Sequence, residues 1–366
     1  MLEFSDYYSD KELKFIRLQT KESKIRFSKG LLQLIHKKQW LRIAIPHYRN
    51  GNPMSALEIA LLFEALAYAD GSLGWAINLG AGANMFLGYL NQDTSKRLAN
   101  IPNLWLAGSG APTGTAIETE NGYIVSGYWK YASGSLYATH FTANAYLYNK
   151  NKQPILNCEK NPIYRSFLFP AKEVEILNTW NTLGLRASCS NDYKLQAVFV
   201  PSEYGFDLTK NSFYNELSLY RYPFDAFAVS NIAVMCTGIT QHFIELFEQD
   251  ILTKKSLYDT QQLKENSKVK NLFNTLSCDF YKSRSLFLAD LKKLEYAVEH
   301  DKANIKEKEV RLQLSAKCSV DTAYRLIMEL YRFCGMNAVF VQNELNKVVQ
   351  DFLVATQHYS IRPYTI

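Results

Sequence analysis

Hydrophobic residues recur every three or four positions at both ends of this chain and at every second position in its middle. The first spacing is typical of helices that bury one face, and the second is typical of strands. The pattern predicts a helical segment at residues 1–101, a strand-rich segment at 102–208 and a second helical segment at 209–366. We expect an α+β fold with three domains at these boundaries.

The first helical segment contains clear start and stop signals. Ser9-Asp10 can cap a helix that continues to Ile35, and Pro53–Ser55 opens another helix with a wide apolar stripe. Asp70–Ser72 breaks that helix. The helix expected next, Leu73–Leu90, is rich in Gly and Ala. So many small residues indicate close helix packing or the wall of a ligand site.

Three β-like runs occupy Trp105–Leu147. The first contains Ser109–Thr115, a stretch of small and hydroxyl-bearing residues whose backbone a flat ligand can approach closely. Asn121-Gly122 predicts a hairpin, and the third run follows Ala132–Gly134. Further short strands are expected at residues 164–170, 174–177 and 193–201. This spacing of strands and turns is typical of a β-barrel or a β-sandwich.

The second helical segment contains four periodic stretches, with Gly335 as a natural break before the last one. They lie at residues 224–249, 272–300, 307–334 and 337–355. Long amphipathic helices of this kind can form an antiparallel bundle. The second stretch carries more apolar positions than one narrow face can hide, namely Phe273, Leu276, Phe280, Leu286, Phe287, Leu291 and Leu294. We therefore expect a homodimer or a homotetramer formed through the bundle.

Composition and charge exclude several classes of protein. With 47% hydrophobic and 14% aromatic residues the chain is too apolar to be disordered. The net charge is +6, but basic and acidic side chains alternate, as in Gln262–Lys270, which favours solvated helix faces over a nucleic-acid groove. Charges interrupt the apolar stretches, so we expect no membrane span.

The cellular compartment and several kinds of site also follow from sequence patterns. The N-terminus lacks the basic and apolar regions of a signal peptide, and the six cysteines are scattered, so we expect a reduced, cytoplasmic protein. Motifs for a phosphate-binding loop, a dinucleotide fold, a zinc protease or a serine hydrolase are missing. The sequence indicates no metal site. A bound planar cofactor would explain the small and hydroxyl-bearing residues at the ends of the central strands.

Four motifs, in order and at matching separations, resemble the acyl-CoA dehydrogenase superfamily. They are Gln39–Pro46, Phe63–Trp75, Gly122–Gly134 (GYIVSGYWKYASG) and Trp180–Pro201. The resemblance covers nearly the whole chain. It implies a helical N-terminal domain, a central β-barrel and a C-terminal four-helix bundle. It also implies a bound flavin, FAD or FMN, and a small-molecule substrate.

The same resemblance implies which residues bind the flavin. Ser109, Thr113 and Thr115 would bond the edge of the ring, with turn chemistry as the alternative role, and Gly114 would leave room for that edge. The other implied residues are Ser133 after the second strand, His140 at the position of a ring-stacking Trp, Thr142 on the same strand face, and Arg186, Ser188 and Ser190 in a bordering loop.

Two branches of the superfamily use this flavin differently. Acyl-CoA dehydrogenases need a Glu base, but the Tyr-Glu-Gly-like motif is missing and Asp225 is the only carboxylate near the other position of that base. The C-terminal stretch Gln350–His358 instead resembles flavin-dependent monooxygenases. If Asp351 and His358 share a helix face, seven residues apart, Asp351 can orient His358. His358 would then be the catalytic residue; the alternative is a surface role for it.

Three interpretations remain open. The first is a reduced-flavin monooxygenase acting on a small organic substrate, supplied by a separate flavin reductase. The second is an acyl-CoA dehydrogenase with a relocated base, which would work with an electron-transfer flavoprotein. The third is a flavin-free binding or assembly protein. The superfamily's phosphate-binding Arg and Phe are missing from Thr253–Asp259 (TKKSLYD), where Lys254 or Lys255 can contact phosphate instead.

Overall fold

The N-terminal part of the computed structural model is helical, as expected. The model describes residues 4–22, 25–47, 51–255, 262–301 and 303–363. Within these ranges, five α-helices precede the sheet, namely α1 (Asp10–Glu22), α2 (Lys29–Lys37), α3 (Ala56–Ala69), α4 (Gly71–Asn84) and α5 (Gln92–Ala99), with short 3-10 turns at Phe4–Asp6 and Met85–Tyr89. The expectation of one continuous helix from Ser9 to Ile35 is wrong. α1 ends at Glu22, and a separate helix, α2, begins at Lys29, where the Ser28 side chain caps it by accepting from the Leu31 amide.

Within the described part of the chain, the strands form one mixed sheet of seven members. They are β1 (Leu106–Glu118), β2 (Gly122–Ala132), β3 (His140–Tyr148), β4 (Tyr164–Pro170), β5 (Glu175–Leu177), β6 (Asn191–Pro201) and β7 (Gly205–Phe206). The order is β5-β6-β2-β1-β3-β4-β7, and the β1–β2 hairpin at Asn121-Gly122 is confirmed. The expected closed barrel is not formed, because no ladder joins β5 to β7 in the part of the chain that is described.

Helices return after the sheet. They are α6 (Ser218–Arg221), α7 (Phe224–Leu246), α8 (Ser267–Glu299), α9 (Ile305–Tyr331) and α10 (Glu344–Ala355), with a π-helical turn at Phe247–Ile251 and 3-10 turns at Leu263–Glu265, Met336–Val339 and Tyr359–Ile361. The break at Gly335 is confirmed, and its φ of 70° explains the choice of glycine.

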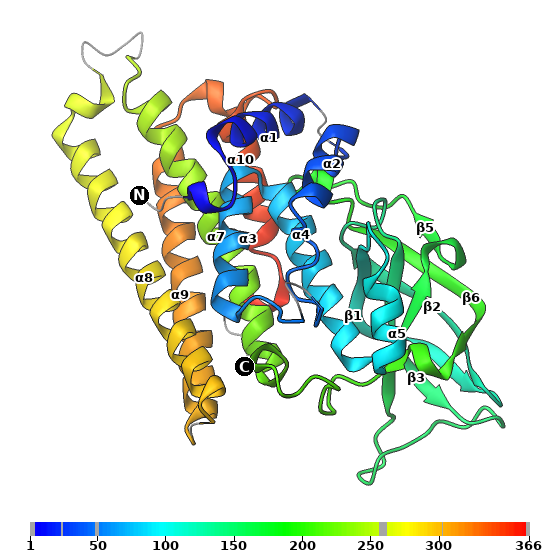
Figure 1. Cartoon of the computed structure of the whole chain (residues 1–366). Coiled ribbons are helices and arrows are strands. Elements are labelled where there is room, and N and C mark those ends of the chain that lie inside the picture. Colours follow the sequence, from blue (N-terminus) through cyan, green and yellow to red (C-terminus); the bar gives the residue numbers. More distant parts are fainter. Residues whose placement is uncertain (1–3, 23–24, 48–50, 256–261, 302, 364–366) are drawn as a thin grey trace.

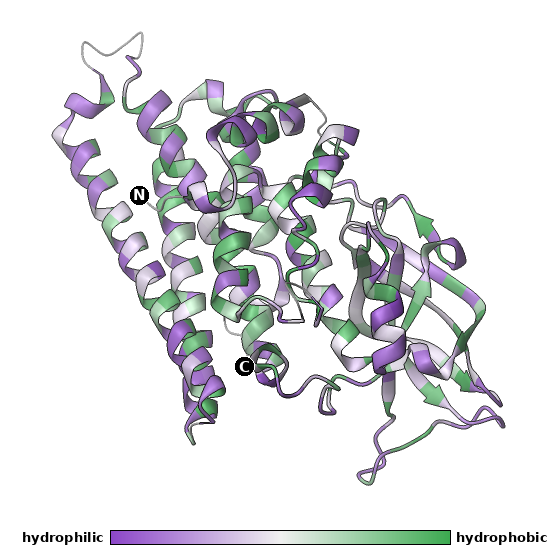
Figure 2. Ribbon diagram, in the orientation of Figure 1, coloured by the Kyte–Doolittle hydropathy of each residue, from purple (hydrophilic) through white to green (hydrophobic). Residues whose placement is uncertain are grey.

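The helices form one layered body beside the sheet, with α8 and α9 on its outer side (Figure 1). α3 packs along α7, and α8 pairs with α9. Figure 2 shows α3 and α7 as largely hydrophobic, whereas α8 is mixed. A helix that is apolar all around must be covered on every side. The body is therefore built from both ends of the chain rather than from its C-terminal helices alone.

The helix that contains α7 is an exception to the expectation that charges interrupt every apolar stretch. Phe224–Ile251 is long and apolar enough to cross a membrane by length and composition, because it contains an 18-residue window with a mean hydropathy of 1.3. Most of its apolar window, 94%, is buried inside the protein. The helix lies in the middle of the helical body, which accounts for its composition without a membrane.

The argument for an oligomer from α8 is also wrong in its physical reason. Of the seven apolar side chains expected to need a partner, six are buried within this chain, and only Leu286 is exposed, at 46%. They pack in the hydrophobic core shared by the helices. The expected oligomer stays a prediction that needs a different surface.

Candidate active site

A chain of buried hydroxyl groups marks the end of the sheet nearest the helices. The Ser133 and Ser190 hydroxyls lie 2.8 Å apart, and Ser190 lies 2.8 Å from the Ser188 hydroxyl. All three side chains are buried. Each hydroxyl can act as donor or acceptor, so the cluster can adapt to either kind of group. The sequence predicts a flavin-binding role for all three serines, and the structure places Ser190 between Ser133 and Ser188.

The loop that carries two of these serines has an unusual backbone. Leu185 and Cys189 have φ values of 52° and 48°, in the left-handed region, on either side of a 3-10 turn. The Gly134 amide donates to the Ser188 carbonyl at 2.7 Å, and the Ser135 hydroxyl donates to the Cys189 carbonyl at 2.6 Å. These bonds hold the loop against the end of β2 and bring the hydroxyls together.

Trp75 and His358 extend the cluster toward the helices. The indole N–H of Trp75, on α4, donates to the Ser133 hydroxyl at 3.1 Å. The His358 ring lies edge-on to the Trp75 ring, with 5.9 Å between centroids. His358 Nδ1 accepts from the Ser360 amide at 3.3 Å, so the neutral ring carries its proton on Nε2. Burial lowers the pKa of His358 to about 4.

The predicted relation between Asp351 and His358 is wrong. α10 ends at Ala355, so His358 lies beyond it, in extended backbone that caps the last 3-10 turn. The two residues therefore share no helix face. Asp351 instead accepts from the Leu185 amide at 2.5 Å and from the Lys347 ammonium at 2.8 Å. It holds the serine loop rather than the histidine.

The low pKa of His358 predicts a pH-dependent stability. Its folded value of about 4 lies below the ordinary 6.5, so the unfolded chain binds more protons between these values. Stability should fall as the pH decreases from 6.5 to 4, by up to about 3 kcal/mol from this group. The measurement is the thermal midpoint against pH, compared with His358→Gln.

The Gln variant is needed because burial also lowers the pKa of other histidines, which contribute with the same sign. His358→Gln should lose less stability over this interval than the wild type. Parallel pH curves for the two proteins would contradict the burial of a neutral His358.

Four further predicted residues lie at the same end of the sheet. β1 and β3 are parallel, which places Ser109 beside Ala143 and the buried Thr142 beside Gly108. A Cβ at Gly108 would come within 2.1 Å of the Thr142 hydroxyl, so glycine is required there. His140 starts β3, half-buried, with Nδ1 3.1 Å from the Thr139 hydroxyl. Arg186 lies in the turn before Ser188.

Three other predicted residues serve the sheet itself. The Thr113 and Thr115 hydroxyls donate to carbonyls of β2, those of Tyr128 and Ser126, at 2.6 and 3.5 Å. A Cβ at Gly114 would lie 2.2 Å from the Trp129 side chain. The space at Gly114 is therefore filled by Trp129, and the expectation that it leaves room for a ring edge is wrong.

The chemistry of this donor set suits a flavin. The polar edge of an isoalloxazine ring presents both donors and acceptors, which three hydroxyls, an indole N–H and a neutral imidazole can match. Beyond Ser109, a Cβ at Gly110 would meet no atom within 4 Å, so the strand is open there. Of the expected phosphate segment, residues 256–259 lie outside the described residues. Among those described, no group of His, Cys, Asp or Glu could hold a metal ion.

Comparison with solved structures identifies the fold. The HsaA monooxygenase from Mycobacterium tuberculosis superposes with a TM-score of 0.84 at 18% identity, covering 97% of this chain and 92% of that one. XiaF from a Streptomyces species, solved with FADH2 and glycerol, superposes with a TM-score of 0.81 at 18% identity, covering 96% and 90%. The fold is that of flavin-dependent monooxygenases.

Sequence comparison then relates the chain to particular proteins. It is 25% identical to an indole-3-acetate monooxygenase of Acinetobacter baumannii over 332 residues, which cover 90% of this chain and 83% of that protein. A shorter match, 31% over 146 residues, is to the oxygenase subunit HsaA of M. tuberculosis and covers 39% and 35%. No protein-family model matches. The chain is a homologue of the oxygenase components of flavin-dependent monooxygenases, which confirms the interpretation as an oxidoreductase of this kind.

Proposed function

We propose that this chain is the oxygenase component of a two-component monooxygenase that uses reduced FAD or FMN to hydroxylate a small aromatic substrate. The main support for this proposal is a buried cluster in a chain that is homologous to such oxygenases. The cluster consists of Ser133, Ser188, Ser190, Trp75 and His358. The names of relatives, such as indole-3-acetate monooxygenase, support an aromatic substrate.

The residues that would hold the flavin follow from the donor set. Ser133, Ser188 and Ser190 would bond its polar edge, and Ser109, His140 and Thr142 would contact it from the end of the sheet. The reduced flavin, when bound, supplies the electrons that activate dioxygen. A separate flavin reductase would deliver it, because oxygenase components of this kind are named as one subunit of a larger system.

The chain's own residues would orient the ligand, exclude water and donate a hydrogen bond. Trp75 fixes the Ser133 hydroxyl, which in turn fixes Ser190. Burial excludes water from these hydroxyls and strengthens their bonds to a ligand. His358 is neutral above about pH 4, so its Nε2–H can donate a hydrogen bond at the reacting centre.

Three further features are proposals of the same kind. We propose membership of the wider acyl-CoA dehydrogenase superfamily, a cytoplasmic location, and domains at residues 1–101, 102–208 and 209–366. We also propose a homodimer or homotetramer. An exposed apolar segment after Gly335 supports it, with Met336 at 75% and Val341 at 62% exposure.

The test is reduced-flavin binding followed by turnover. The wild type, given reduced flavin from a purified reductase, should consume oxygen and convert indole-3-acetate to a product heavier by one oxygen atom. Ser190→Ala should weaken reduced-flavin binding by about tenfold, the effect of one lost hydrogen bond. The matched control is Ser202→Ala, at an exposed serine after β6.

The two alternatives predict different results. A flavin-free binding protein would show no reduced-flavin binding in the wild type. A dehydrogenase would bind flavin but oxidise an acyl thioester without consuming a reductant. Asp225, its nearest candidate base, is exposed in the first turn of α7, which does not favour that chemistry.

A further inference from the structure

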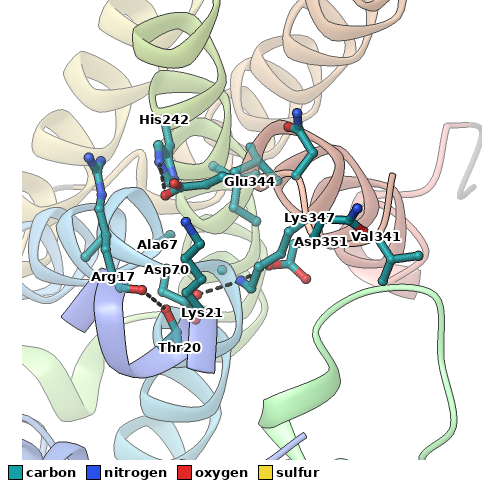
Figure 3. A pocket seen from close by; sticks show the side chains of 16 residues that line it. Arg17, Thr20, Lys21, Ala67, Asp70, His242, Val341, Glu344, Lys347 and Asp351 are labelled. Atoms are coloured by element: carbon teal, nitrogen blue, oxygen red, sulfur yellow. Dashed lines mark hydrogen bonds and ion pairs between the residues drawn. The ribbon is translucent and has the colours of Figure 1, made fainter. Parts of the chain in front are cut away.

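One lysine joins two buried carboxylates in a crevice lined by α1, α3, α4, α7 and α10 (Figure 3). The Lys347 ammonium donates to Asp70 at 2.6 Å and to Asp351 at 2.8 Å. Both carboxylate side chains are only 3% exposed, and Lys347 is 27% exposed. Two buried carboxylates thus share one ammonium as their counter-ion.

Each carboxylate holds an element that carries part of the candidate site. Asp70 caps α4 by accepting from the Leu73 amide at 2.9 Å, and α4 carries Trp75. Asp351 accepts from the Leu185 amide, at the left-handed residue that begins the serine loop. Lys347 connects these two contacts across segments that are far apart in the sequence.

The three segments approach as closely as their backbones permit. A Cβ at Gly71 would lie 2.8 Å from Asp351 Oδ2, and a Cβ at Gly184 would lie 2.2 Å from the Gln350 carbonyl. Such close approach leaves little room to absorb a shift of α10. α10 ends at Ala355, three residues before His358, so its position sets where His358 meets Trp75.

We propose that Lys347 is a positioning residue for the monooxygenase site, because its ammonium holds α4, the serine loop and α10 together and thereby sets Trp75, Ser190 and His358 against one another. The inference rests on the proposed function for its catalytic consequence. The geometric consequence, a displaced His358, holds with or without a flavin.

Charge balance is the physical basis of this role. Burial raises the pKa of Asp351, whereas the pKa of Asp70 is lowered because the nearby ammonium outweighs its burial. Removing the ammonium leaves two buried carboxylates near each other without a counter-ion, and burying such uncompensated charges is strongly unfavourable. The other charged or titratable groups lining the crevice are Arg17, Lys21, His242 and Glu344.

The decisive variant is Lys347→Met, with Lys21→Met as the matched control, since Lys21 is an exposed lysine that lines the same crevice. We expect Lys347→Met to lower turnover by about 10²-fold, the usual effect of a small misplacement. Histidine NMR should show the pKa of His358 rising by about 1 as its burial loosens. Lys21→Met should resemble the wild type in both.

A double variant that restores the net charge distinguishes the loss of the positive charge from the loss of the lysine side chain itself. Lys347→Met with Asp70→Asn returns the net charge of the cluster to its original value and keeps an oxygen that can cap α4. We expect it to regain at least about tenfold of the lost turnover and the original His358 titration. If the single variant fails to fold, the turnover and the His358 titration of the double variant are compared directly with those of the wild type.

The outcomes distinguish the two proposals. A folded Lys347→Met chain with unchanged His358 titration and turnover overturns the role of Lys347, and so does a double variant as impaired as the single one. If the wild type binds no reduced flavin, the proposed function fails. The His358 titration would still decide whether Lys347 positions that residue.

Discussion

Replacing His358 with alanine is expected to lower substrate turnover by about 10²-fold or more, the usual contribution of a positioned acid or base. The fold and reduced-flavin binding should be retained, because the His358 side chain accepts only one local hydrogen bond, from the Ser360 amide, among the contacts described. Single-turnover measurements with reduced flavin, oxygen and indole-3-acetate would show the loss of hydroxylated product.

The matched control is Asp225→Asn, at the exposed carboxylate on the first turn of α7. It should stay near the wild type. The opposite ranking, with Asp225→Asn inactive and His358→Ala active, would favour the dehydrogenase interpretation. If neither change alters turnover, the assignment of chemistry to these helices is wrong.

The sequence predicted those parts of the fold that local patterns determine. Helix positions in the C-terminal segment and the β1–β2 hairpin follow from apolar spacing and from Asn121-Gly122. What it could not predict is pairing between distant segments. α3 packs along α7 because both are apolar on nearly every side, but their periodicity does not identify the partner.

The same limit explains the corrected oligomer argument. Apolar positions on α8 show that something must cover them, and the sequence does not tell whether the cover is α9, α7 or another chain. In the structure, Phe280 and Phe287 are fully buried by the chain itself. A count of apolar positions therefore indicates burial without locating its partner.

For the candidate site, the motifs identified loops whose serines meet in the structure, and they misjudged the contacts of several other side chains. Ser133 and Ser188 meet through Ser190, and this depends on two left-handed residues that no local pattern indicates. Thr113 and Thr115 share the composition of a ligand-binding strand, yet their hydroxyls bond the neighbouring strand. Composition shows which functional groups a strand carries, and the register of the sheet determines which way their side chains point.

Asp351 does not have the partner that the sequence predicted. Its seven-residue spacing from His358 suggested a shared helix face, but α10 ends between them. Its true contacts are with Leu185, on a loop far away in sequence, and with Lys347, one helical turn before it. The i, i+4 relation to Lys347 was visible in the sequence, whereas the second carboxylate, Asp70, was not.

Replacing Arg284 with methionine is expected to cause the largest loss of stability among single substitutions in the helical body. Arg284 on α8 binds both carboxylate oxygens of Glu64 on α3, with Nε 2.6 Å from one of them. Glu64 is completely buried and also accepts from Thr237 and Gln241 of α7. The contact thus joins three helices.

Without the guanidinium, the Glu64 carboxylate would remain buried and uncompensated, and such a loss costs about 3–5 kcal/mol. Chemical denaturation followed by circular dichroism would measure it. The control is Arg325→Met, whose ion-pair partners Glu329 and Asp279 are both exposed and which should leave the unfolding curve unchanged. Adding Glu64→Gln to Arg284→Met should recover part of the stability, because it removes the buried charge. If Arg284→Met were as stable as the control, the contact would contribute nothing to holding α3, α7 and α8 together.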